Sequence, residues 1–565
     1  MDHIKLLNQV RSRETIRLAF KYAISDRIQN DSYFDHFEIE YVQKFQEKII
    51  EELLQELKKT DQFSPRTGYA YYLPKTELCY RRMIYIPFKD LVVRYAFVIV
   101  LAKHLDQSLS DNCFANRREK GGKAKEFLLE NYYKVSLPKF RNWQKDCANK
   151  YDILIKTDIS AFYDSVSHQY LIKTLAEQLC IKPETAFFRL FKKLLCVDVI
   201  SYCQKAKTVN SPKTLHQGLT IGNNLEGFLA NLYLKNIDDA MQSAGIEFGR
   251  YNDDIRIFAE NREIAQLHLL ILQDHLLTKG LNLNSSKTKI AENKEQIEQL
   301  QTKVYDLSPS LYDNSEENEA GGYIDVVVKT NEVQKNIDPE LDDLDNDFNP
   351  NGEIKAEKDA KNFCLFFSKK LNPKKRVPAH IKTLEKILTH WQGSSKNASW
   401  LIVNSIYNKD VSLETQMASI ERVFNILPSL EALSYTKYRL IHNLIHLKPD
   451  PKTPEVRVIH QLDDNRKEEF RTILFDLLKQ PTFELNFIAL YAFRILGDSS
   501  KNLEKYAHQY IPKPLGSPIL TVLDYLQDLE AILLWQKTQT EISIDSNNTA
   551  EELNDHEQYE TPEFY

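Results

Sequence analysis

Two neighbouring aspartates, Asp253 and Asp254, are the residues of this sequence best suited to hold a metal ion. They lie within residues 248–259, where apolar and polar residues alternate as in a β-strand, and Asn252 before them favours a tight turn. A turn would expose both carboxylates, which are the ligands that hard divalent cations prefer. Two such cations, about 3.5–4 Å apart, activate a hydroxyl and stabilise a leaving pyrophosphate in nucleotidyl transfer. Because aspartates are also common in ordinary turns, the rest of the sequence has to decide.

A third aspartate, Asp158, ends an apolar, β-branched run at residues 153–157 that predicts a buried strand. At the end of a strand its carboxylate can project into a cleft. The following residues, 159–164, predict the entry into a helix, so a helix-capping role is the structural alternative. We interpret Asp158 as the third metal-binding carboxylate.

A glycine-bearing loop at residues 216–224 precedes a predicted helix that starts near Leu225. It contains Gln217 and Gly218, and a glycine there lets the backbone approach a ligand closely. By itself the loop indicates no particular ligand.

The composition is that of a soluble globular protein with two or three domains, with 565 residues, 42% hydrophobic and 27% charged. The net charge of −6 does not indicate nucleic acid, although local basic patches decide that question. No apolar run is long enough to span a bilayer, and the first residues do not resemble a signal peptide. The odd number of cysteines, 7, without a C-x-x-C pair favours reduced thiols and a cytoplasmic location.

The composition changes near residue 305. An acidic run at residues 338–347 predicts a linker or insertion, which a short strand-like piece at 323–328 interrupts. From about residue 361, helical periodicity predicts an all-α region of stacked helix pairs. Residues from about 541 predict a disordered acidic tail.

Six motifs in one order resemble those of reverse transcriptases. Asp158, then Gln217-Gly218, then Tyr251-Asn-Asp-Asp254 resemble the palm motifs. Downstream, Gly280-Leu-Asn-Leu-Asn284 and Lys287-Thr288 resemble the next motif. Upstream, residues 81–87 with Asp90 and residues 114–117 resemble two fingers motifs.

The resemblance implies an α+β right-hand polymerase with fingers and palm, followed by an all-α HEAT-like helical-repeat domain. We expect the fingers and palm at residues 1–305, the acidic linker or insertion at 306–360, the helical domain at 361–540 and the tail at 541–565. The resemblance also implies an RNA-directed DNA polymerase that uses dNTPs and an RNA or DNA strand.

The metal site that the resemblance implies consists of Asp158, Ile159, Asp253 and Asp254. It would hold two Mg²⁺ ions, which Mn²⁺ could replace. Tyr163 falls where the family keeps its aromatic steric gate, whose ring would collide with a ribose 2′-hydroxyl. The structural alternative is a core aromatic beside Phe162.

The other implied contacts concern the nucleotide. Arg82 and Arg117 fall where the family binds the triphosphate, and a guanidinium suits phosphate, although Arg81 or Arg118 could be the true contact. Gln217 and Gly218 would lie against the incoming nucleotide and template. Lys287 would either protonate pyrophosphate or contact backbone. The basic residues of the fingers region favour a nucleic-acid groove over a solvated basic face; they are Lys89, Arg94, Lys103, Arg117, Arg118, Lys120, Lys123 and Lys125.

A palm followed by helices resembles the abortive-infection and other defence-associated reverse transcriptases of bacteria. His216 and Asn252 depart from other lineages, which often have Pro before Gln-Gly and Ala or Met after the Tyr. The resemblance implies anti-phage defence, DNA synthesis that is RNA-templated or untemplated and protein-primed, a homo-oligomer formed through the helical domain, and a non-coding RNA as a further partner. The alternatives are a group II intron or retron-type enzyme of a mobile element, and a non-catalytic nucleic-acid scaffold.

Overall fold

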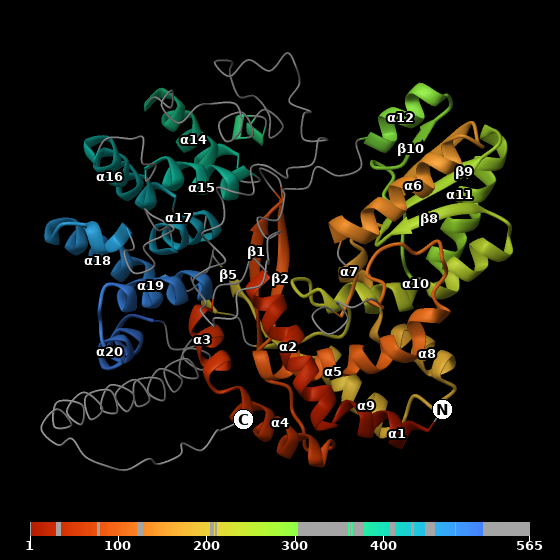
Figure 1. The fold of residues 1–565 in the computed structure, drawn as a ribbon, viewed down its shortest axis with the longest axis horizontal. Coiled ribbons are helices and arrows are strands. Elements are labelled where there is room, and N and C mark those ends of the chain that lie inside the picture. Colours follow the sequence, from red (N-terminus) through yellow and green to blue (C-terminus); the bar gives the residue numbers. More distant parts are fainter. Residues whose placement is uncertain are drawn as a thin grey trace, which may run out of the picture.

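The computed structural model describes residues 2–302 apart from 30–34, 76–78, 121–127, 131, 204–207 and 210–211. It also describes residues 360–511 apart from 362, 365–377, 392–393, 407–412, 431–433, 447–457 and 481. The fold is mixed α/β with many helices (Figure 1). The predicted linker, apart from Ala360, and the predicted tail lie outside the described residues.

The elements of the first half alternate between helices and short strands. Its helices are α1 (His3–Val10), α2 (Arg13–Gln29), α3 (His36–Lys44), α4 (Gln46–Glu56), α5 (Phe88–Leu105), α6 (Leu137–Ala148), α7 (Phe162–Ser165), α8 (His168–Leu179), α9 (Ala186–Leu195), α10 (Leu225–Ser243), α11 (Arg262–Leu277) and α12 (Lys294–Thr302). Its strands are β1 (Gly68–Pro74), β2 (Tyr80–Tyr85), β3 (Ile153–Asp158), β4 (Asp198–Ile200), β5 (Tyr202–Cys203), β6 (Thr208–Val209), β7 (Lys213–Thr214), β8 (Glu247–Tyr251), β9 (Asp254–Ala259) and β10 (Lys289–Ala291).

The sheet that carries the aspartates has the strand order β10-β3-β9-β8, with all neighbours antiparallel. Its strands alternate between two cores, because successive side chains of a strand point to opposite faces. Ile155 and Ile257 join the large core that includes α10 and α11. Leu154 and Phe258 pack on the other face with residues of α6 and α12. Helices therefore cover both faces, and the strand ends are held rigidly.

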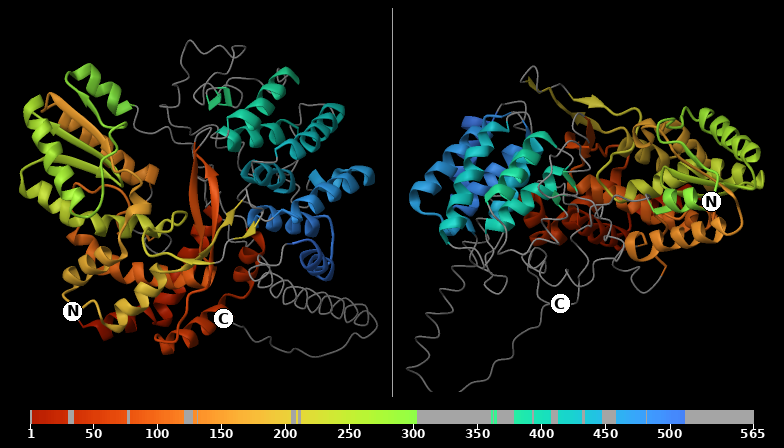
Figure 2. Two further views of the ribbon diagram at one scale, coloured as in Figure 1. Left: turned by 180° about the vertical axis from the view of Figure 1, so that it is seen from behind. Right: turned by 90° about the horizontal axis from the view of Figure 1, so that it is seen from above.

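A second sheet has the order β2-β1-β4-β7. Its β1–β2 hairpin stands between the aspartate-bearing sheet and the carboxy-terminal helices (Figures 1 and 2). Ala70 and Ile84 face the large core of the first half. Tyr69 and Tyr85, from the opposite face of the hairpin, join the core of the carboxy-terminal helices.

The carboxy-terminal half is helical where it is described. It contains α14 (Pro378–His390), α15 (Ser395–Ile406), α16 (Leu413–Ser429), α17 (Ser434–His446), α18 (Asp464–Leu478), α19 (Phe483–Ile495) and α20 (Ser500–Tyr510). Most consecutive helices pack on one another, from α14 to α17 and from α18 to α20, as do α15 with α17 and α17 with α19. The HEAT-like repeat stays a prediction.

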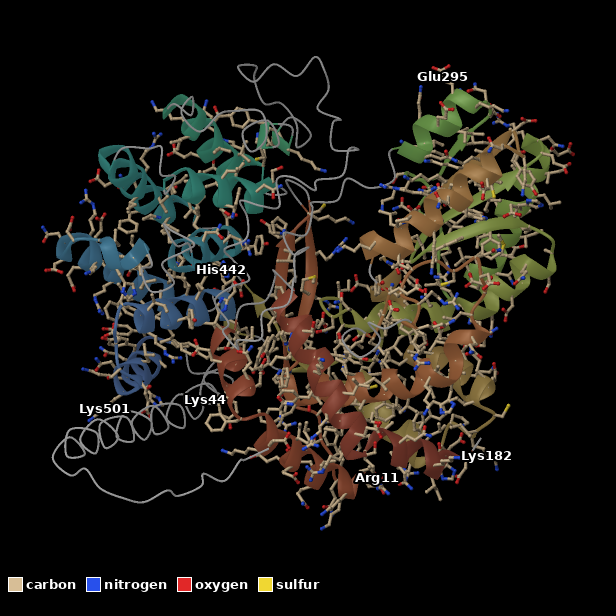
Figure 3. The ribbon with its side chains drawn as sticks, viewed as in Figure 1. Arg11, Lys44, Lys182, Glu295, His442 and Lys501 are labelled. Atoms are coloured by element: carbon tan, nitrogen blue, oxygen red, sulfur yellow. The ribbon has the colours of Figure 1, made fainter. Side chains whose placement is uncertain are left out.

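Polar and aromatic contacts join the two halves. Glu40 of α3 accepts a hydrogen bond from the Tyr491 hydroxyl at 3.0 Å and pairs with Arg494 at 2.6 Å. The ring of His36 stacks on that of His442, labelled in Figure 3, with centroids 5.1 Å apart. The helical half is thus packed against the hairpin side of the first half. Within the described residues, no helix is both long and apolar enough to cross a membrane.

Candidate active site

The three aspartates meet at one end of the β10-β3-β9-β8 sheet. Asp158, the last residue of β3, is paired in register with Asp254, the first residue of β9. Asn252 and Asp253 form the turn between β8 and β9, and Asn252 adopts a left-handed conformation with φ 57°. Asparagine tolerates this conformation better than most residues do. The main-chain N–H of Ile159 donates to the Asp253 carbonyl at 3.2 Å, which ties the turn to the end of β3.

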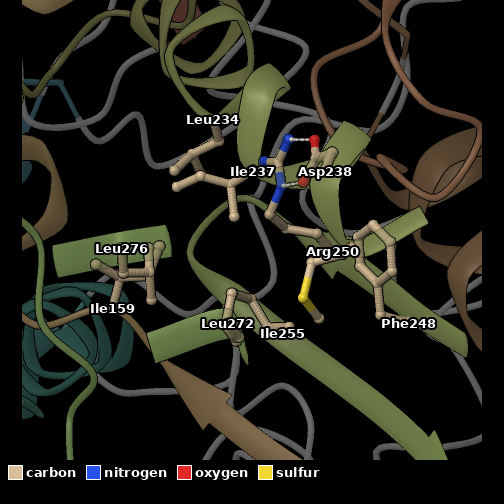
Figure 4. A pocket seen from close by; sticks show the side chains of 10 residues that line it. Ile159, Leu234, Ile237, Asp238, Phe248, Arg250, Ile255, Leu272 and Leu276 are labelled. Atoms are coloured by element: carbon tan, nitrogen blue, oxygen red, sulfur yellow. Dashed lines mark hydrogen bonds and ion pairs between the residues drawn. The ribbon is translucent and has the colours of Figure 1, made fainter. Parts of the chain in front are cut away.

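A buried arginine on β8 holds this turn through a hydrogen bond to its backbone. Arg250 is 1% exposed, and its guanidinium donates to both carboxylate oxygens of Asp238, at 3.0 and 2.6 Å (Figure 4). Its remaining donors reach the Asn231 side chain at 2.8 Å and the Asn252 carbonyl at 3.0 Å. Asn116 adds a hydrogen bond to the Asn252 side chain. The turn that carries Asp253 is therefore anchored at its backbone and at its side chain.

The carboxylates repel one another where no cation lies between them. Burial raises the pKa of Asp253 to about 6, and the charges of Asp158 and Asp254 add to the rise. Lys287 donates to Asp158 Oδ2 at 2.8 Å, and Arg256 binds both oxygens of Asp254. Two of the three carboxylates are thus paired with basic side chains of the same site.

The donor set fits a hard divalent cation, since it consists of carboxylate oxygens whose mutual repulsion a cation would relieve. Ile159 can contribute only its main-chain carbonyl, because its side chain is apolar. In the part of the chain that the structure describes, no group of three His, Cys, Asp or Glu residues is already arranged around a metal position. Arg256 would compete with a cation for both oxygens of Asp254, whereas Lys287 contacts only Oδ2 of Asp158.

The Gln217-Gly218 loop packs against α7, the short helix that follows β3. The N–H of Gly218 donates to the Val166 carbonyl and that of Leu219 to the Tyr163 carbonyl, both at 2.8 Å. Gln217 Nε2 donates to the carbonyl of Asp164 at 3.2 Å. A Cβ on Gly218 would lie 3.2 Å from the Asp164 carbonyl oxygen, and its φ is 92°, so only glycine fits there without strain.

Tyr163 accepts a hydrogen bond from the Leu219 N–H of this loop at its carbonyl, and its side chain interacts electrostatically with Asp253. Its ring contacts Phe162 edge-on, with centroids 5.4 Å apart. Burial raises the pKa of its hydroxyl, and the negative charge of Asp253 raises it further. The side chain is half-buried, whereas Phe162 is a core residue at 2% exposure.

The predicted phosphate-binding arginines differ in their surroundings. Arg82 is exposed on β2 and lies 3.4 Å from the carboxylate of Asp164, beside the loop. Arg117 donates to Asp106 and to the carbonyls of Ser110 and Cys113, so most of its donors are already used within the fold. This geometry favours Arg82 over Arg117 as a contact for a triphosphate.

The basic residues expected to line a groove are only partly on the surface. Arg94 is 5% exposed and pairs with the buried carboxylate of Glu226 at 2.7 Å, so its charge serves the fold and not a nucleic acid. Lys89 is paired with Glu52 at 2.5 Å. Lys123 and Lys125 lie outside the described residues.

Residues that support the site were missed by sequence reasoning. They are Asn116, Asp238, Arg250 and Arg256. Arg250 and Arg256 flank the Asp-Asp pair within the predicted alternating strand, where their charges beside the two aspartates were the available signal. Asn116 belongs to the 114–117 motif, but nothing local pointed to its partner Asn252, 136 residues away, and Asp238 gave no sign of its pairing with Arg250.

Comparison with known proteins agrees with the motifs. Residues 75–304 match the family described as reverse transcriptase (RNA-dependent DNA polymerase). The matched range contains the three aspartates, the Gln217-Gly218 loop and Lys287. A search of curated proteins found no match to the chain. The matched domain indicates an RNA-directed DNA polymerase, which is a nucleotidyltransferase, with a nucleic-acid template and dNTPs as substrates.

Proposed function

From the reverse transcriptase domain at residues 75–304, we propose that this chain joins dNTPs by two-metal nucleotidyl transfer, with Asp158, Asp253 and Asp254 as the metal ligands. The observation that carries the proposal is the register of β3 with β9, which pairs Asp158 with Asp254 beside the turn that holds Asp253. Two bound divalent cations, Mg²⁺ or Mn²⁺, would activate the attacking hydroxyl and stabilise the leaving pyrophosphate.

The other residues of the site bind and orient the substrate. The guanidinium of Arg82 can bind a phosphate in a bidentate manner once its weak contact with Asp164 opens. Lys287, whose ammonium donates to Asp158, can turn to the pyrophosphate as its negative charge develops. Gln217 and Gly218 would contact the base of the incoming nucleotide and the template.

Removal of divalent cations should abolish DNA synthesis without unfolding the protein. We expect extension of a labelled primer on an RNA template in Mg²⁺, and a loss of at least about 1,000-fold in excess EDTA, because the carboxylates alone cannot activate the hydroxyl. Gel analysis of the products measures this, and added Mg²⁺ should restore synthesis. The melting temperature, followed by circular dichroism, serves as the control for folding. Undiminished synthesis in EDTA would refute the proposal.

Tyr163 is proposed to exclude ribonucleotides through its ring. We expect Tyr163→Ala to increase rNTP incorporation relative to dNTP by about 10- to 100-fold, since the substitution removes the group that a 2′-hydroxyl would strike. Single-nucleotide incorporation kinetics measures the ratio. Tyr170→Ala is the matched control, because Tyr170 is 44% exposed on α8. If Tyr163 were only a core aromatic, its substitution would lower the melting temperature and leave the ratio unchanged.

For the biological role we propose anti-phage defence. The support is the resemblance of a palm followed by helices to the defence-associated lineages, together with the described helices from α14 to α20. The same resemblance supports synthesis that is templated by RNA or untemplated and primed from a protein hydroxyl, and association of copies through the helical half. A defence role of this kind requires that protection of a host depends on DNA synthesis.

A further inference from the structure

A buried histidine next to the Gln217-Gly218 loop has no part in the functions considered so far. His168 is the first residue of α8, after the capping residue Ser167, and is 3% exposed. Its Nε2 lies 2.7 Å from the Gly218 carbonyl oxygen, and its Nδ1 lies 3.5 Å from Sγ of Cys196. The imidazole therefore bridges the loop and the end of α9.

The two partners fix the protonation of the ring. Burial lowers the pKa of His168, so the imidazole is neutral at pH 7 and carries one N–H. The Gly218 carbonyl can only accept a hydrogen bond, so the proton is on Nε2. Nδ1 is then an acceptor, and the Cys196 thiol is the group positioned to donate to it.

Both main-chain polar groups of Gly218 are hydrogen-bonded. Its N–H donates to the Val166 carbonyl at 2.8 Å, and its carbonyl accepts from His168. The next N–H, that of Leu219, donates to the carbonyl of Tyr163. Because Leu219 follows Gly218 directly, a shift of Gly218 would also move the Leu219 N–H and, through its hydrogen bond, the backbone of Tyr163.

We propose that His168 is a positioning residue for nucleotide selection, which acts by holding the Gly218 carbonyl and so fixes the loop against α7, the short helix that carries Tyr163. The inference rests on the proposed function, since it assigns His168 to the selection of dNTPs over rNTPs at the same site. His168 would act on the nucleotide only indirectly, through Gly218 and Tyr163.

The test compares two substitutions that differ in the donor. His168→Leu removes the N–H, whereas His168→Gln supplies an amide N–H close to the position of Nε2. We expect His168→Leu to raise KM for dNTP and to lower discrimination against rNTP by about tenfold, with a smaller change in kcat. His168→Gln should retain discrimination within about threefold of the wild type.

His104→Leu is the control for the loss of a part-buried histidine, because His104 Nε2 lies 3.1 Å from the Gln9 side chain, away from the loop. It should leave discrimination unchanged. Equal discrimination in His168→Leu and the wild type, or no recovery in His168→Gln, would overturn the inference while the polymerase function stands.

A second measurement does not depend on activity. Nitrogen NMR of ¹⁵N-histidine-labelled wild-type protein should show His168 as the neutral Nε2–H tautomer, and detection of the Nδ1–H tautomer would overturn the inference. A wild-type chain that incorporates no dNTP would overturn the proposed function and, with it, the role of His168 in selection.

Discussion

Asp253→Asn should reduce dNTP incorporation by at least about 1,000-fold, because the substitution removes a charge from the proposed metal site, whose ions would contribute several kcal/mol to the transition state. Incorporation on a primed RNA template under single-turnover conditions measures the loss. The substitution should not lower the stability of the fold. The folded protein raises the pKa of Asp253 to about 6, so its ionised form destabilises the fold at neutral pH. Without metal, the variant should therefore unfold at the same or a higher temperature.

The matched control is Asp274→Asn, since Asp274 is exposed on α11, and full activity is expected there. The same two variants test the biological role when they are expressed in a bacterium that is challenged with phage. Protection should disappear with Asp253→Asn and persist with Asp274→Asn. Protection by a chain that synthesises no DNA would refute a defence role based on polymerisation, and incorporation at the wild-type rate would refute the assignment of Asp253.

Arg250→Met should lower the free energy of unfolding by about 3–5 kcal/mol, because it leaves the Asp238 carboxylate buried without its partner. Urea unfolding monitored by circular dichroism measures the change. The double variant Arg250→Met/Asp238→Leu should regain much of the loss, since an apolar pair replaces both charges. DNA synthesis should stay low in both variants, because neither restores the hydrogen bond from Arg250 to the Asn252 carbonyl.

The control is an exposed ion pair of the same kind. Arg262 and Glu292 lie 2.6 Å apart, with side chains 60% and 40% exposed, and Arg262→Met should cost at most about 1 kcal/mol. A loss of similar size in both single variants would contradict the burial argument. Recovered synthesis in the double variant would show that Arg250 contributes only stability and does not hold the turn.

The strands at the site were predictable because their signal is local. Alternation around Asp253 and the apolar run before Asp158 predicted β9 and β3, and both are strands. The inclusion of Arg94 among the groove residues was wrong, because a positive charge in the sequence does not reveal that a carboxylate 132 residues away is buried against it. The acidic segment and the tail fall outside the described residues, so the linker and the disordered tail remain predictions.

The sequence by itself determined the candidate site residues and the class of reaction that they predict. The aspartates, the Gln217-Gly218 loop and Lys287 follow one another in the order and spacing of the reverse transcriptase motifs. The tertiary structure decided how these groups are held. The partners of Asn252, Gly218 and Asp158 come from elements whose proximity depends on packing, and the register of β3 with β9 is set by the cores on both faces of the sheet. Local patterns carry no information on such contacts, because a hydrogen bond between distant residues exists only once the chain has folded.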